Sequence, residues 1–402
     1  MGRIPILLEQ GVSLVDISVV LLAFFGGIKY FFKEKNFFIY PGFWLFSLFL
    51  LVGFSSLLIN SHEMVLNFGE FSQSFLYFVR YLLFGTLIFL SFNFGKNFGD
   101  DEKKSEENKN FLINGIFISS FIIFILGTLQ MKFFGNFEKL GMQNLGWDPH
   151  IGRMLSTWFD PNFLSGYFAF VISLAVGVAW EQYFKFKKIN YFLIFLIFCL
   201  ISGIIFSYSR SGLLAFLVAS GILGIFLSRK FLLIFTIIFI LGIGVSDRAK
   251  ERFFDGVESA KNIFFNTGTL DPTAKLRVKS WETGIQLFQE KPWLGRGFNT
   301  LKIVQKEKWV FMTKSHGASG IDASFLTVLA TTGLVGFLLF LGFILWILFF
   351  NFKKFLQKKD GFAIGLFAGL LGILANAIFV NILFFYLFLP ILFIAIGLGF
   401  LG

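Results

Sequence analysis

Long apolar runs separated by short polar segments make up most of the chain. A helix needs about 20 apolar residues to cross the roughly 30 Å hydrocarbon core of a membrane, and a helix satisfies its own backbone groups there. At roughly 1.5 Å per residue, a single helix over the uncharged stretch 362–402 would be about twice as long as the hydrocarbon core is thick, so the chain must turn near residues 376–381. The pattern predicts an all-α, polytopic integral membrane protein with about 11 transmembrane helices, at residues 12–29, 37–59, 72–92, 111–131, 161–180, 190–208, 211–228, 231–246, 324–350, 362–379 and 382–401.

Lysine and arginine concentrate in a subset of the segments between these runs. With this number of crossings the basic segments all fall on one side, which the positive-inside rule makes cytoplasmic. They are residues 29–35, 93–110, 181–190, 228–230 and 351–360. We interpret the polar segment 93–110 as a disordered linker. The charge distribution therefore predicts a multi-pass protein of the cytoplasmic membrane.

One segment outside the predicted spans, residues 247–323, is long enough to fold over the outer membrane face. Asp271 and Pro272 favour the start of a helix within it. An amphipathic helix on the membrane surface is expected from the helical spacing of Arg277, Trp281, Ile285 and Phe288. The chain thus divides into N-terminal transmembrane helices (1–246), this extracytoplasmic loop (247–323) and C-terminal transmembrane helices (324–402), which form one membrane-embedded domain.

Composition agrees with this class and narrows the chemistry. Hydrophobic residues make up 56% of the 402 residues and charged residues 15%, against roughly 45–50% and about 25% in soluble domains. A single cysteine and three histidines argue against a disulfide framework and against a metal site, and we expect no cofactor. The net charge of +11 falls largely in the basic segments, so it reflects topology and does not indicate nucleic-acid binding.

Polar residues that persist in a membrane protein mark its candidate sites. Here they gather in four groups on the predicted outer side, with Arg80 separately inside the third apolar run. The groups are RMLSTWFDPN (153–162), SYSRSG (207–212), AKLRVKSWETGIQLFQEKPWLGRGFN (274–299) and SHGASGIDASFLTVLATTGLVG (315–336).

These four groups, in this order, resemble the O-antigen ligase and polymerase superfamily, which includes bacterial protein O-oligosaccharyltransferases. The Pro-Asn pair at 161–162 looks like the family's helix start, and SYSRSG is similar to its serine-arginine-glycine turn. The spacing R-x-x-x-W followed by PWLGRGFN looks like its loop signature, and ASFLTVLATTGLVG resembles the helix after its His-Asn motif. The resemblance covers roughly residues 150–345.

The resemblance implies transfer of a glycan from a polyprenyl-pyrophosphate carrier to an acceptor hydroxyl at the outer membrane face, without a metal. The acceptor hydroxyl would belong to a glycan, a lipid or a protein. Guanidinium groups stabilise the charge of a pyrophosphate leaving group, and we assign this role first to Arg210 and Arg277, with Arg153 and Arg80 as supports. Asn162 and Trp281 are supporting residues.

The chain departs from the family at the position of the catalytic base. In register with Phe325 and Leu326, the family's histidine and asparagine fall on Asp322 and Ala323. Either a carboxylate or an imidazole can deprotonate an acceptor hydroxyl. We therefore name Asp322 as the first candidate base and His316, six residues upstream, as the second.

Simpler interpretations stand beside these assignments. An arginine at a helix end also contacts lipid headgroups, Asp322 and Asn162 are both suited to capping a helix, and His316 fits a polar loop. A glycan transporter or flippase is the alternative function, for which ionisable residues near the bilayer midplane and broken helices are expected. The nearly uncharged apolar runs favour the enzyme, and the sequence leaves polymerase, ligase and protein glycosyltransferase open.

Overall fold

The computed structural model describes residues 13–34, 37–96, 102–135, 150–230, 247–265, 272–307 and 320–401, together with Leu233, Ile237 and Gly244. Within this part of the chain every regular element is a helix, which confirms the all-α prediction. The helices are α1 (Leu14–Gly27), continued by a π-helical turn to Lys33, α2 (Phe43–Glu63), α3 (Phe68–Lys96), α4 (Glu102–Phe133), α5 (Pro161–Phe186), α6 (Tyr191–Ser207), α7 (Arg210–Phe226), α9 (Asp247–Phe265), α10 (Pro272–Glu290), α11 (Leu301–Glu307), α12 (Ser324–Lys358), α13 (Gly361–Ala377) and α14 (Leu389–Gly399).

Six helices in the described ranges are long and apolar enough to cross a membrane: α1 with its π turn, α2, α3, α4, α5 and α12. The apolar helices α6, α7, α13 and α14 are shorter. The predicted span 231–246 lies almost wholly outside the described residues. The predicted turn near 376–381 is confirmed, because α13 ends at Ala377 and a short 3₁₀ turn over Ile382–Phe384 precedes α14.

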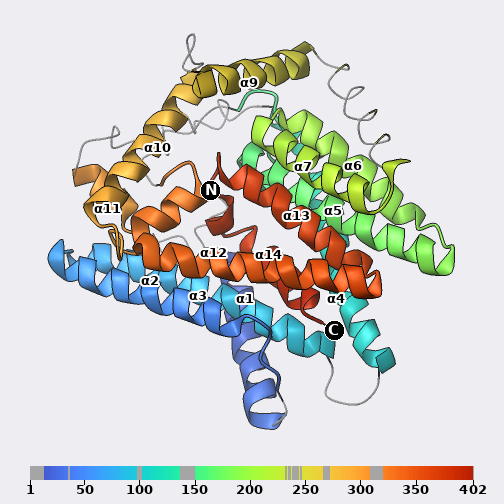
Figure 1. Cartoon of the computed structure of the whole chain (residues 1–402), viewed down its shortest axis with the longest axis horizontal. Coiled ribbons are helices and arrows are strands. Elements are labelled where there is room, and N and C mark those ends of the chain that lie inside the picture. Colours follow the sequence, from blue (N-terminus) through green and yellow to red (C-terminus); the bar gives the residue numbers. More distant parts are fainter. Residues whose placement is uncertain are drawn as a thin grey trace.

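Helices α5 and α13 pack against each other at the centre of the protein (Figure 1). Glycines allow this closeness: a Cβ atom on Gly177 of α5 would lie 2.0 Å from the carbonyl oxygen of Gly361 of α13. A Cβ on Gly365 would likewise lie 2.6 Å from the carbonyl oxygen of Ser173. Small residues of this kind are the usual means of close helix packing in membranes. Because α7 packs on both α5 and α13, the three helices form one body.

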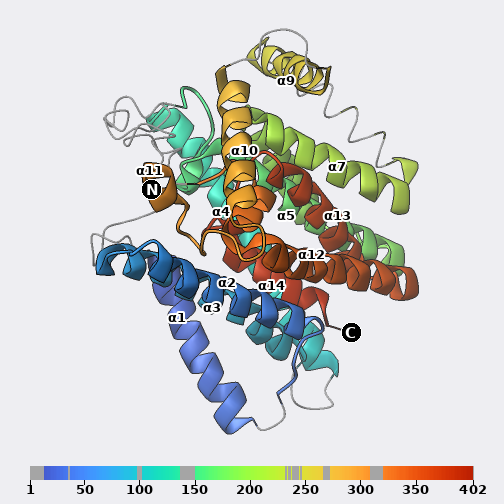
Figure 2. The same ribbon diagram turned by 60° about the vertical axis from the view of Figure 1, so that its left-hand side comes forward.

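The helices of segment 247–323 lie together at one end of this bundle. Helix α10 crosses the first turns of α12, and α9 lies beyond α10 over the start of α7 (Figures 1 and 2). On the other side of the protein α1 projects from the bundle and touches mainly α3.

The polar segment 93–110 differs from its prediction. Helix α4 already begins at Glu102, so residues 102–110 are helical and not a disordered linker. The reason is local: Ser105 Oγ and Asn108 Nδ2 donate hydrogen bonds to the carbonyls of Gly95 and Phe94, which end α3 without partners of their own. The polar end of α4 thus caps its neighbour.

The basic segment 351–360 carries a buried ion cluster. The carboxylate of Asp360 lies 3.0 Å from Lys354 Nζ and 3.4 Å from Lys109 Nζ, and it also caps α13 by accepting from the Ala363 N–H at 2.8 Å. Burial alone would raise the pKa of Asp360, but the two ammonium groups and the N–H outweigh it and hold that pKa below its usual range. The cluster ties α4, α12 and α13 together on the predicted cytoplasmic side.

Candidate active site

Helix α5 begins at the Pro-Asn pair, and its cap is Asp160. The Asp160 carboxylate accepts from the N–H groups of Asn162 at 2.7 Å and Phe163 at 3.3 Å, with Pro161 in the first helical position. The interpretation of Asn162 as the cap is therefore wrong. Instead the Asn162 side chain points to the next motif, where its Oδ1 accepts a hydrogen bond from Ser209 Oγ at 2.9 Å.

The turn between α6 and α7 is the SYSRSG motif. Tyr208 takes a left-handed conformation (φ 49°), and Ser209 caps α7 by accepting from the Gly212 N–H at 3.2 Å. Gly212 lies directly against α5, since a Cβ atom there would come within 1.9 Å of Ser165 Oγ. The first two polar groups of the sequence are thus joined, and Arg210 is placed at the first residue of α7.

Arg153 is buried behind this turn. Its Nε donates to the Ser207 carbonyl at 2.8 Å, and its Nη2 lies 3.5 Å from the Tyr208 carbonyl. These carbonyls belong to the end of α6, where helical partners are lacking. Arg153 therefore holds the turn that carries Arg210 in place.

Helix α9 covers Arg210. The Arg210 Nη1 lies 3.5 Å from Ser259 Oγ, and a Cβ atom on Gly256 would lie 2.9 Å from Arg210 Cδ. Arg248 of the same helix places its guanidinium 4.8 Å from the centre of the Tyr208 ring. The sequence analysis missed α9, although apolar residues recur at helical spacing within this charged segment, at Phe253, Val257, Ala260 and Phe264.

Arg80 lies apart from these motifs, in α3. Its Nε and Nη2 form a two-pronged ion pair with the Asp16 carboxylate of α1, at 2.6 and 2.8 Å. Its guanidinium also lies 4.9 Å from the ring centre of Tyr77 and 5.5 Å from that of Tyr386. Arg80 and Asp16 both lie within predicted spans, and their charges compensate each other, which favours a structural role for Arg80.

Helix α10 fixes the main chain around Asp322. Ser280 Oγ accepts from the Asp322 N–H at 2.9 Å, and Trp281 Nε1 donates to the Asp322 carbonyl at 3.2 Å. The cap position of α12 is Ala323, with no side-chain cap. The capping interpretation of Asp322 is therefore wrong, because its carboxylate does not cap α12.

The charges that act on Asp322 come from two other elements. Surrounding protein raises the pKa of Asp322, Arg277 of α10 opposes the rise, and Asp160 at the start of α5 adds to it. Arg277 precedes Trp281 by one helical turn, so both lie on the same side of α10. The segment of α10 with Arg277 and Trp281, the Pro-Asn motif at the start of α5 and the start of α12 are therefore close enough for their charges to interact.

The apolar side of α10 differs from the predicted one. Ile285 is 45% exposed, whereas the side chains of Ser280, Thr283 and Leu287 are buried. That buried side packs on the protein, against residues such as Ile321 at the start of α12. Helix α10 begins at Pro272, as predicted, ends at Glu290 and packs on α12.

His316 and Asp271 lie outside the described residues. In the described ranges no group of three or more histidine, cysteine, aspartate or glutamate side chains is arranged to hold a metal ion.

Residues 194–341 match the family model described as O-antigen ligase. This match supports membership of the chain in the O-antigen ligase superfamily. The segment that matches the O-antigen ligase family runs from α6 into α12 and contains Arg210, Arg277, Trp281 and Asp322. Asn162 precedes it. No curated protein sequence matches the chain.

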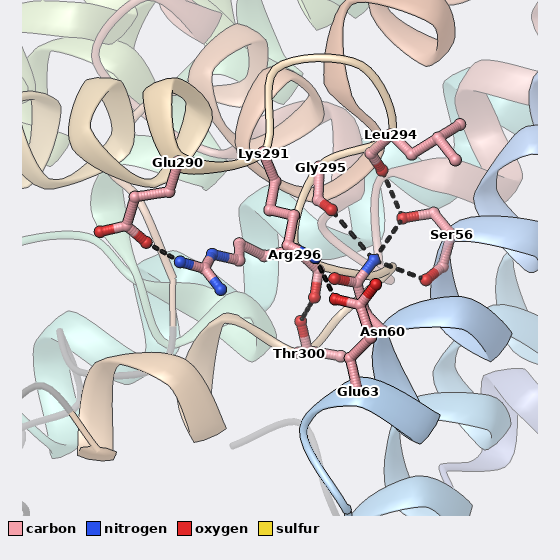
Figure 3. Close-up of polar contacts among 9 residues, drawn as sticks. All are labelled: Ser56, Asn60, Glu63, Glu290, Lys291, Leu294, Gly295, Arg296 and Thr300. Carbon is pink, nitrogen blue, oxygen red and sulfur yellow. Dashed lines mark hydrogen bonds and ion pairs between the residues drawn. The ribbon is translucent and has the colours of Figure 1, made fainter.

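The loop segment PWLGRGFN (292–299) has a structural role that the sequence did not reveal. It enters a break in α12, where Gly333 leaves the helical conformation with φ 64° and ψ −167° (Figure 3 shows the loop side). The sequence predicted an unbroken helix from residue 324 to residue 350. Glycine is frequent in membrane helices, so Gly333 by itself did not indicate a break.

Proposed function

We propose that the protein is a membrane glycosyltransferase that moves a glycan from a polyprenyl-pyrophosphate carrier to an acceptor hydroxyl, at the outer face of the cytoplasmic membrane. The observation that carries the proposal is the arrangement around Asp322. Its main chain is held on both sides by α10, its carboxylate does not cap α12, and the positive charge of Arg277 opposes the rise in its pKa. The O-antigen ligase match of this segment supports the same reaction class.

In the proposed reaction the acceptor oxygen attacks the anomeric carbon of the carrier-linked sugar. The acceptor proton passes to the Asp322 carboxylate, the new glycosidic bond forms, and the bond to the pyrophosphate oxygen breaks with its electron pair on the leaving polyprenyl pyrophosphate. Arg210 and Arg277 stabilise that developing negative charge. These guanidinium groups take the role that a metal has in other pyrophosphate chemistry, so the proposed reaction needs no metal.

The supporting residues act on these groups through the contacts described above. Arg153 and Asn162 hold the turn before Arg210, and Trp281 holds Asp322. Arg80, paired with Asp16, stabilises the packing of α1 on α3 and has the weakest claim to contact the carrier. His316 remains the second candidate base.

The alternative, a transporter or flippase for lipid-linked glycans, is favoured by one observation, the break in α12. Transport folds use such breaks to expose backbone groups to a substrate. Here the exposed groups of α12 are bonded to the loop 292–297, and the polar motifs cluster at helix ends, so the enzyme is the better explanation.

The direct test uses the purified protein in lipid nanodiscs with a synthetic polyprenyl-pyrophosphate oligosaccharide. We expect release of polyprenyl pyrophosphate only when an acceptor is added, with a new glycosidic product by mass spectrometry. Glycan, glycolipid and serine-peptide acceptors, offered separately, distinguish polymerase, ligase and protein glycosyltransferase. Movement of the intact carrier across a liposome membrane, without release, would support the flippase instead.

The proposed orientation has its own test. In a Cys199→Ser background, Gln286→Cys on α10 should react with an impermeant thiol reagent in intact cells, and Gln357→Cys near the end of α12 should react only after permeabilisation. Both side chains are exposed, whereas a cysteine at neighbouring Gly361 would collide with α5. The expectation follows from the basic segment 351–360, and the reverse labelling pattern would place the site on the cytoplasmic side.

A further inference from the structure

The break in α12 is closed by main-chain pairing with the loop 292–297. On one side of Gly333 the N–H groups of Arg296 and Gly297 donate to the carbonyls of Ala330 and Thr331, at 2.8 and 3.1 Å. On the other side the Leu334 N–H donates to the Pro292 carbonyl at 2.8 Å. The loop therefore takes over backbone groups that a continuous helix would have bonded internally.

Two glycines permit this contact. A Cβ atom on Gly295 would lie 2.4 Å from the Thr331 carbonyl carbon, and one on Gly333 would lie 2.3 Å from the Trp293 carbonyl. Both residues also have positive φ angles, 69° and 64°, which side chains other than glycine rarely adopt. The first glycine of the loop signature is thus needed for the approach of one main chain to another.

Helix α2 holds this contact between the loop 292–297 and α12 in place with two buried polar side chains (Figure 3). Ser56 Oγ lies within hydrogen-bond distance of the Leu294 carbonyl and 2.9 Å from the Thr331 carbonyl. Asn60 Nδ2 donates to the Gly295 carbonyl at 3.0 Å. Ser56 is 0% and Asn60 2% exposed. Of these two side chains, Ser56 bonds to both the loop and the broken helix, and Asn60 bonds to the loop.

The break divides α12 into an outer part, residues 324–332, and the long inner part that follows. Asp322 stands two residues before the outer part. The outer part is joined to the loop, and the loop continues directly from α10, which carries Arg277. The position of Asp322 relative to Arg277 is therefore set by the pairing of the loop 292–297 with α12, as well as by the contacts of Ser280 and Trp281.

We propose that Ser56 and Asn60 are positioning residues for the transfer reaction: they hold the loop 292–297 in the break of α12 and so fix Asp322 relative to Arg277. This inference rests on the proposed function. Ser56 and Asn60 touch neither carrier nor acceptor, so they act on the rate of the chemical step and not on carrier binding.

The first measurement compares Ser56→Ala and Asn60→Leu with Ser55→Ala, a half-buried serine that is the direct neighbour of Ser56 on α2. Displacement of catalytic groups by about 1 Å costs up to roughly 10²-fold. We expect kcat to fall on the order of tenfold in Ser56→Ala and in Asn60→Leu, with KM for the carrier unchanged. Neither parameter should change in Ser55→Ala. A rise in KM at constant kcat would overturn the proposal.

The second measurement asks whether the effect passes through Asp322. In an Asp322→Asn background Ser56 and Asn60 have no base to position, so adding Ser56→Ala should leave the residual turnover unchanged. An equal loss in both backgrounds would mean that Ser56 serves general stability, and the proposal would fail.

Hydrogen exchange supplies a readout that does not depend on turnover. Amides of residues 330–335 should exchange faster in Ser56→Ala than in Ser55→Ala, with the other helices unchanged. Unchanged exchange would mean that Ser56 does not hold the loop 292–297 in the break of α12. Faster exchange at normal kcat would mean that Ser56 holds the loop but has no positioning role in the reaction. An inactive wild-type protein would contradict the proposed function, and with it the positioning role, whatever the exchange result.

Discussion

Replacing either Arg210 or Arg277 with alanine is expected to lower turnover by on the order of 10²-fold or more, the usual cost of removing a donor that stabilises charge in the transition state. Both guanidinium groups would face the pyrophosphate as it leaves. Lysine should restore activity only in part, because an ammonium is a point charge and lacks the two-pronged geometry of guanidinium. The measurement is release of polyprenyl pyrophosphate at equal amounts of folded protein.

The matched control is Lys275→Ala, which removes an exposed cation from the same helix as Arg277 and should leave turnover unchanged. Arg80→Ala offers a second contrast. Because Arg80 is paired with Asp16, its loss should lower the amount of folded protein more than the turnover of what remains. Full activity of both the Arg210 and Arg277 alanine variants, at normal abundance, would remove these residues from the mechanism.

Asp322→Asn is expected to lower turnover by about 10²–10⁴-fold, the range typical of a lost general base. The substitution keeps size and shape, and the main-chain contacts of residue 322 with Ser280 and Trp281 do not involve the carboxylate. Because that carboxylate does not cap α12, the protein should stay in the membrane at its normal level. His316→Gln should be mild by comparison.

The pH profile gives a second signature of the base. A base acts in its deprotonated form, so turnover should rise as pH increases through the pKa of Asp322. The surrounding protein raises this pKa, which places the rise above the ordinary aspartate value of about 3.9. The residual activity of Asp322→Asn should lack that rise.

Other outcomes for the base are equally informative. A fully active Asp322→Asn combined with an inactive His316→Gln would assign the base to the histidine. Full activity of both variants would mean that another group deprotonates the acceptor, while the assignments of Arg210 and Arg277 would be unaffected.

The apolar runs predicted most of the helices because crossing a membrane imposes both length and composition on a helix. The pairing of the first two motifs was also within reach of the sequence, since each places polar residues at the outer end of a long apolar helix. Asn162 and Ser209 do meet there. What sequence reasoning missed is which atoms meet: Asp160, not Asn162, caps α5.

The break in α12 was not predictable in the same way. The carbonyls of Ala330 and Thr331 and the N–H of Leu334 pair with the loop 292–297, which lies nearly 40 positions earlier, and Ser56 of α2 adds a bond to the Thr331 carbonyl. Local propensity contains no information about such distant partners. The same holds for Asp16 and Arg80, two charges in separate helices that become a pair only in the folded protein.

The glycine contacts between α5 and α13 have a consequence in terms of entropy. Glycine has no rotamers to lose on packing, and between membrane helices the hydrophobic effect gives little drive, so close van der Waals contact must hold them together. At Gly177 and Gly361 one main chain rests on another with no side chain between them. The start of α5, with Asp160 and Asn162, therefore belongs to a pair of helices whose contact at Gly177 and Gly361 is made by main chain and does not depend on side-chain conformation.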